Sequence, residues 1–198
     1  MNTPTGFALV AQSGRTVFDT ELGVFGIAWT RGGLCRVCLP GDDGGNAERR
    51  LSRTAPAECV VVRSEAAWPG WVRALVADIR RYASGEKVDF SHVPLDLSRA
   101  RAFHRSIYVE ALKLGFGEVA TYGELAARAG HATAARETGQ AMGSNPVPLV
   151  VPCHRVLAAG RKLGGFSAPG GGETKMRLLA LEGVRLGEPQ PDQIAFSF

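Results

Sequence analysis

The residues best suited to chemistry in this chain are three consecutive ones, Cys153, His154 and Arg155. A thiolate is the reactive form of cysteine, and an adjacent imidazole or cation favours it by lowering the thiol pKa. The apolar run at 149–151 precedes them in a proline-rich stretch, which predicts a short buried segment because prolines cannot propagate a helix. The pattern therefore predicts a reactive cysteine at the end of a buried segment.

Spacing alone leaves a purely structural role open for Cys153. Most free cysteines are small buried hydrophobic side chains. Adjacent side chains of an extended segment point to opposite faces, so Cys153 and His154 could cooperate only through a turn or a bridging water.

The composition is that of an ordinary globular protein. The 198 residues, of which 45% are hydrophobic and 21% charged, can form one large domain or two small ones. With 23 Lys and Arg against 19 Asp and Glu, the net charge of +4 permits a polyanionic partner without requiring one. No long apolar span or signal-peptide pattern opens the chain, so we expect a cytoplasmic protein without a membrane partner.

The other cysteines do not form a recognisable framework. Four cysteines at irregular spacing are too few for a disulfide scaffold, and a reactive thiol needs a reducing compartment. Cys35 and Cys38 form a C-x-x-C pair in an alternating strand pattern, where positions three apart face opposite sides of a sheet. No second pair with ligand spacing follows, so a structural role is favoured and no metal is expected.

The first half of the chain predicts a small antiparallel sheet covered by a helix. Short apolar runs between glycine-rich turns are typical of strands, and Trp71, Leu75 and Ile79 recur at helical spacing. The polar stretch 87–97 is predicted to be a linker, which gives a first domain over 1–97. The predicted elements are strands at 6–10, 23–29, 34–39 and 59–62 and helices at 46–54 and 69–82.

The second half predicts a mainly helical domain over 98–187, followed by a tail over 188–198. Thr121 with Glu124 three residues later is a capping-box pattern, and Gly130 separates two short helices. These two helices fit a helix-turn-helix or a plain αα-hairpin; small residues in the second helix favour close approach to another surface. The glycine-rich stretch 165–172 lacks a phosphate-binding pattern and is predicted to form a pocket wall. The predicted helices are 100–114, 122–129, 133–142 and 173–182.

The Pro-Cys-His-Arg-Val motif has a distinctive context. Gly-Ser-Asn-Pro-Val-Pro precedes it, and Gly-Gly-Phe-Ser and Leu-Glu-Gly follow it. From about Phe103 to Gly187 the chain resembles the O6-alkylguanine-DNA alkyltransferases, also called methylated-DNA–protein-cysteine methyltransferases. The resemblance implies an α/β protein with an RNase H-like N-terminal sheet and helix, and a helical C-terminal domain with a winged-helix-like helix-turn-helix.

The resemblance also implies a reaction. A methyl or other alkyl group passes irreversibly from O6-alkylguanine in double-stranded DNA to Cys153, once per molecule, in a monomer that needs no cofactor or metal. His154 takes the thiol proton through a water, Glu182 holds the imidazole, and Asn145 hydrogen-bonds within this network. Without the motif, a solvated charge at a helix end would be the favoured interpretation of Glu182.

A guanine stacked in a duplex must rotate out to reach a buried thiol, at a cost of roughly a few kcal/mol. The resemblance assigns Arg136 to the gap in the base stack and the Tyr122 hydroxyl to a ring nitrogen of the base. An arginine that contacts phosphate and a core tyrosine are the plainer alternatives. The implied DNA-binding residues are Tyr122, Ala135, Arg136 and Gly139, and the implied pocket residues are Tyr122, Val156, Phe166 and Ser167.

Two other functions fit parts of the pattern. A non-catalytic sensor of alkylated DNA would share the fold, but such relatives lack the acceptor cysteine that is present here at position 153. A thiol hydrolase could use Cys153 and His154, and would turn over ester or peptide substrates repeatedly.

Overall fold

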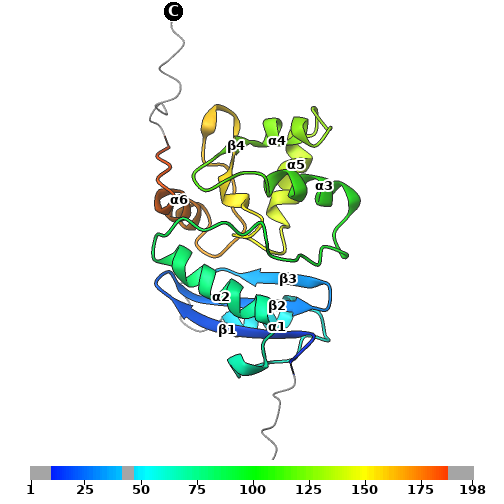
Figure 1. Cartoon of the computed structure of the whole chain (residues 1–198). Helices are drawn as coiled ribbons and strands as arrows, with labels where there is room; N and C mark the ends of the chain where they lie inside the picture. The colour runs from blue at the N-terminus through cyan, green and yellow to red at the C-terminus, as the bar shows by residue number, and fades with distance from the viewer. Residues whose placement is uncertain (1–9, 42–46, 187–198) are drawn as a thin grey trace, which may run out of the picture. The chain divides into compact units, whose positions relative to one another are not determined.

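The computed structural model describes residues 10–41 and 47–186 and divides them into two compact units (Figure 1). The first unit comprises the described residues up to 101 together with Pro146–Val150. The second comprises Ala102–Asn145 and the chain from Val151 onward. The domain limits expected from the sequence, 1–97, 98–187 and 188–198, stay a prediction.

The first unit is built on a three-stranded antiparallel sheet in the order β1-β2-β3. The strands are β1 (Gly14–Thr20), β2 (Gly23–Thr30) and β3 (Gly33–Cys38). The sequence prediction missed β1, because Thr16 is one of its inward-facing residues and the apolar alternation is therefore weak. The strand predicted at 6–10 lies outside the described residues except for Val10.

Two helices cover the sheet, and both were predicted from the sequence. Figure 1 shows α2 (Gly70–Ala83) on one face and α1 (Ala47–Thr54) on the other. Apolar residues at helical spacing in α2, among them Leu75 and Ile79, are fully buried, as is Leu51 of α1. Burial on both faces explains why β2 is buried over most of its length instead of alternating.

Two further predictions for the first unit were wrong. Residues 59–62 form only a single parallel bridge, between Val61 and Arg15, and not a strand. The segment 87–97 is packed into the unit instead of forming a linker: Val88, Phe90 and Val93 are buried, and Leu34 pairs with Leu95.

Gly33 allows this segment to approach closely. Its φ is +127°, and a Cβ at this position would lie 2.4 Å from the carbonyl oxygen of Pro94. Any other residue would therefore have to move the strand or the segment.

A β-bulge changes the surroundings of Cys35 and Cys38. Ala28 pairs with Arg36 but Trp29 pairs with Leu34, so Cys35 is the extra residue on β3. Both cysteines consequently pack against one cluster that contains Cys59, and the prediction that they face opposite sides is wrong.

The thiols of Cys35, Cys38 and Cys59 are protonated near neutral pH. Burial raises the pKa of Cys35 to about 12, and it also raises the pKa values of Cys38 and Cys59. Within the described ranges, no group of three or more His, Cys, Asp or Glu side chains is arranged to hold a metal ion.

The second unit carries α3 (Ala102–Ala111), α4 (Tyr122–Arg128), α5 (Ala135–Gly143) and α6 (Gly172–Leu181). All four helices were predicted, with ends that differ by at most three residues. Helices α3, α4 and α5 pack on one another, and the buried hydroxyl of Tyr108 donates to the carbonyl oxygen of Ala141 at 2.9 Å. No helix in the described ranges has the length and apolarity that crossing a membrane requires.

Short elements connect the helices to the cysteine segment. Strand β4 (Ala120–Thr121) pairs in parallel with β5 (Val156–Leu157), which directly follows the 3₁₀ turn η2 (Cys153–Arg155). Because α4 begins immediately after β4, this pairing places the start of α4 beside the cysteine turn. The turn η3 (Ala159–Arg161) then leads toward the glycine-rich loop.

The capping box predicted at the start of α4 is confirmed. The Thr121 hydroxyl accepts from the Glu124 amide at 3.2 Å, and the Glu124 carboxylate accepts from the Thr121 amide at 2.6 Å. The two bonds satisfy amides that the first turn of a helix leaves unpaired, and they fix where Tyr122 enters the helix.

Candidate active site

Cys153, His154 and Arg155 form the single turn η2 instead of an extended segment. The Cys153 amide donates to the carbonyl oxygen of Val151 at 2.8 Å, and the Arg155 amide donates to that of Pro152 at 2.9 Å. The turn removes the obstacle that an extended chain would present, because consecutive side chains no longer alternate between two faces. All three side chains are buried, with 6%, 0% and 5% of the residue surface exposed.

Glu182, at the C-terminal end of α6, is hydrogen-bonded to two of these residues. Nε2 of His154 donates to Oε1 of Glu182 at 2.8 Å. Arg155 donates from Nη2 to Oε1 at 2.9 Å and from Nε to Oε2 at 2.8 Å. The Gly117 amide adds a bond to Oε2 at 3.0 Å. Glu182 is therefore a buried, fully engaged carboxylate and not a solvated charge at a helix end.

This arrangement determines which ring nitrogen of neutral His154 carries the proton. An ionised carboxylate can only accept, so Nε2 must be the donor in its bond to Glu182. Nδ1 is then left as an acceptor, and it is buried without a hydrogen-bond partner in the part of the chain that the structure describes. Nδ1 of His154, the residue that directly follows Cys153 in the chain, is thus available to accept a proton.

Burial and hydrogen bonding affect the pKa values of His154 and Glu182 differently. Burial lowers the pKa of His154, and the nearby Arg155 and Lys175 lower it further against the opposing effect of Glu182. Burial by itself would raise the pKa of Glu182, but the bonds from His154 and Arg155 outweigh it and hold this pKa well below its usual range. The resting pair is therefore a neutral imidazole and a carboxylate.

The thiol of Cys153 is protonated at rest. Burial raises its pKa, and this effect outweighs the opposing hydrogen bond from Asn145 and the charge of Lys175. Asn145 also donates from Nδ2 to the carbonyl oxygen of Val151 at 2.8 Å. The expectation that the surroundings lower the pKa of this thiol is wrong for the protein alone, because burial disfavours the anion more than its neighbours favour it.

Lys175 on α6 is completely buried close to this thiol. Its Nζ donates to the carbonyl oxygen of Val156 at 2.6 Å and approaches that of Gly165 at 3.4 Å. Burial lowers the pKa of Lys175 to about 8, while Cys153 acts in the opposite direction. The sequence around Lys175 gives no indication of this position, because an isolated lysine on a helix carries no signal of burial.

The structure brings part of the predicted pocket together. The Tyr122 hydroxyl donates to the carbonyl oxygen of Gly165 at 3.4 Å, and Lys175 lies 5.7 Å from the centre of the Tyr122 ring. Val156 is buried in β5, while Phe166 is half-buried and Ser167 exposed in the following loop.

The predicted DNA-binding residues of α5 form a separate group. Ala135 and Arg136 are exposed in the first turn of this helix, and Gly139 is half-buried one turn later. A Cβ on Gly139 would meet no atom within 4 Å, so the packing of α5 in the protein alone does not require glycine there. None of the three takes part in the hydrogen bonds around Glu182.

Sequence reasoning also missed the function of Arg155 within the site. It treated Arg155 only as a cation beside the thiol, whereas the structure shows a two-point bond to Glu182. Adjacency to Cys153 was the available signal. The partner, 27 residues further along the chain, could not be found without the fold.

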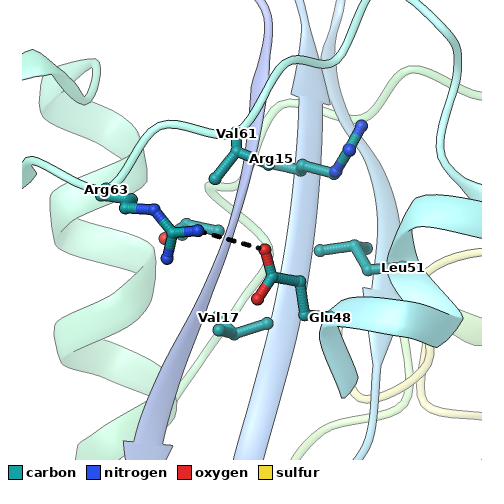
Figure 2. A pocket seen from close by; sticks show the side chains of 7 residues that line it. Arg15, Val17, Glu48, Leu51, Val61 and Arg63 are labelled. Carbon is teal, nitrogen blue, oxygen red and sulfur yellow. Dashed lines mark ion pairs between the residues drawn. The ribbon is translucent and has the colours of Figure 1, made fainter. Parts of the chain in front are cut away.

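A cavity of about 210 Å³ lies in the first unit and contains none of the predicted site residues. Figure 2 shows the side chains of Glu48 and Arg63 facing each other across it, with an ion pair at 3.7 Å. The cavity is lined by Arg15, Thr16, Val17, Glu48, Leu51, Val61 and Arg63.

The fold and the site together define a two-unit α/β protein. Its site contains a buried cysteine followed directly in the chain by a histidine that is hydrogen-bonded to a glutamate. The family model described as "6-O-methylguanine DNA methyltransferase, DNA binding domain" matches residues 102–184. The human methylated-DNA–protein-cysteine methyltransferase is 36% identical over 183 residues, which cover 88% of this chain and 83% of that protein. The Haemophilus influenzae protein of the same name is 43% identical over 104 residues, and this match spans only 56% of its length.

Solved structures agree with the sequence matches. The crystal structure of Mycobacterium tuberculosis OGT in complex with DNA is 31% identical with a TM-score of 0.67, covering 85% of this chain and 91% of that one. The O6-methylguanine-DNA methyltransferase from Pyrococcus kodakaraensis is 26% identical with a TM-score of 0.61, covering 87% and 99%. The chain belongs to the methylated-DNA–protein-cysteine methyltransferase family, as the sequence motifs predicted.

Proposed function

We propose that this protein repairs DNA by transferring an alkyl group, typically methyl, from O6-alkylguanine to Cys153, once per molecule. The observation that carries the proposal is the buried Cys153 thiol beside the hydrogen-bonded pair of His154 and Glu182, in a member of this family. The related OGT was crystallised with DNA, which supports DNA as the partner. We take this DNA to be double-stranded.

The proposed chemistry is a single displacement. The sulfur of Cys153 bonds to the alkyl carbon as the bond from that carbon to O6 breaks, and the electron pair of the broken bond stays on the guanine. The thiol proton passes through a water to Nδ1 of His154, the free acceptor of the site. Glu182 stabilises the resulting imidazolium, as a carboxylate does in other histidine-activated nucleophiles. A thioether has no easy route back to a thiol, so each molecule reacts once.

The substrate base must leave the DNA stack to reach this thiol. We assign Arg136 to the space that the base vacates and Ala135 and Gly139 to close contact with DNA, since all three lie on α5 and the first two are exposed. Tyr122, at the start of α4, serves both the DNA contact and the pocket, with its hydroxyl toward a ring nitrogen of the base.

The remaining pocket assignments concern the loop that follows β5. Val156 and Phe166 would line the pocket, and the Ser167 amide would donate toward O6 of the guanine. Asn145 supports the site through its bond to the Val151 carbonyl.

Four broader assignments belong to the same proposal. We assign an RNase H-like architecture to the first domain and a winged-helix-like helix-turn-helix to the second. The protein acts as a monomer. A thiol that must stay reduced supports a cytoplasmic location.

Incubation with duplex DNA that contains one O6-methylguanine tests the function directly. Intact-mass analysis should show one added methyl group per protein, and peptide mapping should place it on the peptide that contains Cys153. Repeated turnover of the substrate, or release of product from an ester substrate, would instead favour a thiol hydrolase. Tight binding to the damaged duplex without any methyl transfer would favour a non-catalytic sensor.

Replacing Arg136 with alanine should slow repair of duplex DNA at least about tenfold, equivalent to about 1.4 kcal/mol of lost stabilisation of the rotated base. The rate with the free base O6-benzylguanine should stay unchanged, because a free base leaves no gap to fill. Single-turnover rates with both substrates measure the difference. Arg31→Ala, which removes an exposed arginine of the first unit, is the control. Equal losses with both substrates would refute the assignment.

A further inference from the structure

Arg155 donates three hydrogen bonds within the site, yet the displacement itself assigns it no role. Its Nε and Nη2 bind the two carboxylate oxygens of Glu182 at 2.8 and 2.9 Å. Its Nη1 donates to the carbonyl oxygen of Leu114 at 2.6 Å. The guanidinium is therefore held on two sides, and its planar fork matches the carboxylate in the two-point geometry that arginine alone can provide.

This fork leaves Glu182 little freedom to move. Oε1 accepts from His154 and Arg155, and Oε2 accepts from Arg155 and the Gly117 amide. A carboxylate bound to His154 alone could rotate about its last bond and turn its oxygens out of line with Nε2. With Arg155 in place, one oxygen is kept in line with Nε2 of the imidazole, which keeps the proton on Nε2 and leaves Nδ1 open.

The same fork changes the charge that His154 experiences. The charged and titratable groups around this imidazole are Glu182, Arg155, Lys175 and the thiol of Cys153. Glu182 carries one negative charge, and Arg155 neutralises it at hydrogen-bond distance. A protonated His154 would therefore leave a buried cluster with excess positive charge, which is unfavourable away from water.

We propose that Arg155 is a positioning residue of the alkyl-transfer reaction, which orients Glu182 and keeps His154 as a neutral imidazole with Nδ1 free until the thiol proton arrives. The inference rests on the proposed function, because it assigns His154 the role of proton acceptor. It adds a requirement that the displacement alone does not contain: Nδ1 of His154 must be unprotonated in the resting protein. The lowered pKa of His154, to which Arg155 contributes, agrees with it.

Arg155→Met, which keeps much of the side-chain length and removes the charge, provides the test. Single-turnover rates with duplex O6-methylguanine are measured across the titration range of histidine. Without Arg155, the negative charge of Glu182 acts fully on His154, so the imidazolium is favoured. The low-pH limb of the rate profile should move to higher pH by about one unit. At pH values below the midpoint of the wild-type rate profile, the variant should react about tenfold more slowly than the wild type. The difference should become smaller as the pH rises.

Nitrogen NMR of the His154 ring measures the same property without any reaction. Wild-type protein should show the neutral ring with the proton on Nε2. At the same pH, the variant should show either the imidazolium, with a proton on both nitrogens, or a mixture of the two neutral tautomers. Arg177→Met, at an exposed position of α6, should leave both the rate profile and the ring signals unchanged. A purely structural role for Arg155 would lower the rate equally at every pH and leave the ring signals as in the wild type, which would overturn the proposal.

Arg155→Lys covers the case in which the methionine variant does not fold. Lysine keeps the charge but cannot bind both carboxylate oxygens in one plane, so the low-pH limb should shift in the same direction by a smaller amount. An unchanged midpoint with unchanged ring signals would refute the role of Arg155. The absence of methyl transfer in the wild-type protein would refute the proposed function instead, and the ring signals would still report on Arg155.

Discussion

Replacing Cys153 with serine should abolish methyl transfer while the protein stays folded. A serine hydroxyl is close in size to the thiol, but it is a far weaker nucleophile near neutral pH. The pair of His154 and Glu182 would remain, since none of the four hydrogen bonds made by Glu182 involves the sulfur. Intact-mass analysis after incubation with methylated duplex DNA should show unmodified protein where the wild type gains one methyl group.

Cys38→Ser is the matched control for this experiment. Cys38 is half-buried in the first unit, and burial raises its pKa as it does for Cys153, whereas His154 and Glu182 belong to the second unit. The control variant should accept one methyl group as the wild type does. A methyl group found on Cys38 or Cys59, or transfer to the Cys153→Ser protein, would contradict the assignment of the acceptor.

Replacing Glu182 with alanine should lower the free energy of unfolding by about 3–5 kcal/mol, the usual cost of removing one member of a buried ion pair. The variant leaves the Arg155 guanidinium buried with only the Leu114 carbonyl as partner among the bonds it makes in the wild type, and it leaves His154 Nε2 without its acceptor. Methyl transfer should fall with stability, because the imidazole loses the group that stabilises its charged form. Urea unfolding followed by circular dichroism measures the first effect.

The contribution of Glu182 to the free energy of unfolding should decrease at acidic pH. The pKa of Glu182 lies below that of a carboxyl group in the unfolded chain, about 4.3. The charged form therefore contributes stability that is fully present above the unfolded value and is lost as the pH falls through the lower folded value. The stability difference between the wild type and Glu182→Gln should be largest at neutral pH and should decrease below about pH 4.

An exposed glutamate of the same helix serves as the control for both variants. Glu173 lies in the first turn of α6, and Glu173→Ala should change the free energy of unfolding by less than about 1 kcal/mol. Similar losses for Glu182→Ala and Glu173→Ala, or a stability difference that does not depend on pH, would contradict the description of Glu182 as a buried, ionised partner of Arg155.

The raised pKa of the Cys153 thiol has a consequence for how the site works. A permanently ionised thiolate would react with other electrophiles, whereas a buried thiol with a neutral base nearby stays unreactive. We therefore propose that the thiol proton leaves in the same event in which the alkyl group arrives. In the proposed mechanism, burial protects the Cys153 thiol at rest, and the pair of His154 and Glu182 supplies the proton acceptor when the substrate is in place.

Local sequence signals predicted much of the fold. The helices α2 and α4 were predicted because their apolar spacing and the capping box at Thr121 lie within a few consecutive residues. Strand β1 was missed because its inward positions include Thr16, and the packing of 87–97 was missed because it depends on contacts with β3. Long-range pairing leaves no mark in a polar, proline-containing segment.

The sequence by itself determined the chemistry that is available: one cysteine next to a histidine, within a motif that specified the family. Only the tertiary structure decided the state of those groups. Burial sets the thiol as protonated, and the return of α6 to the cysteine turn joins Glu182 to residues 27 and 28 positions earlier. Protonation depends on solvent exclusion and on charges brought together by folding, and neither is a property of neighbouring residues in the chain.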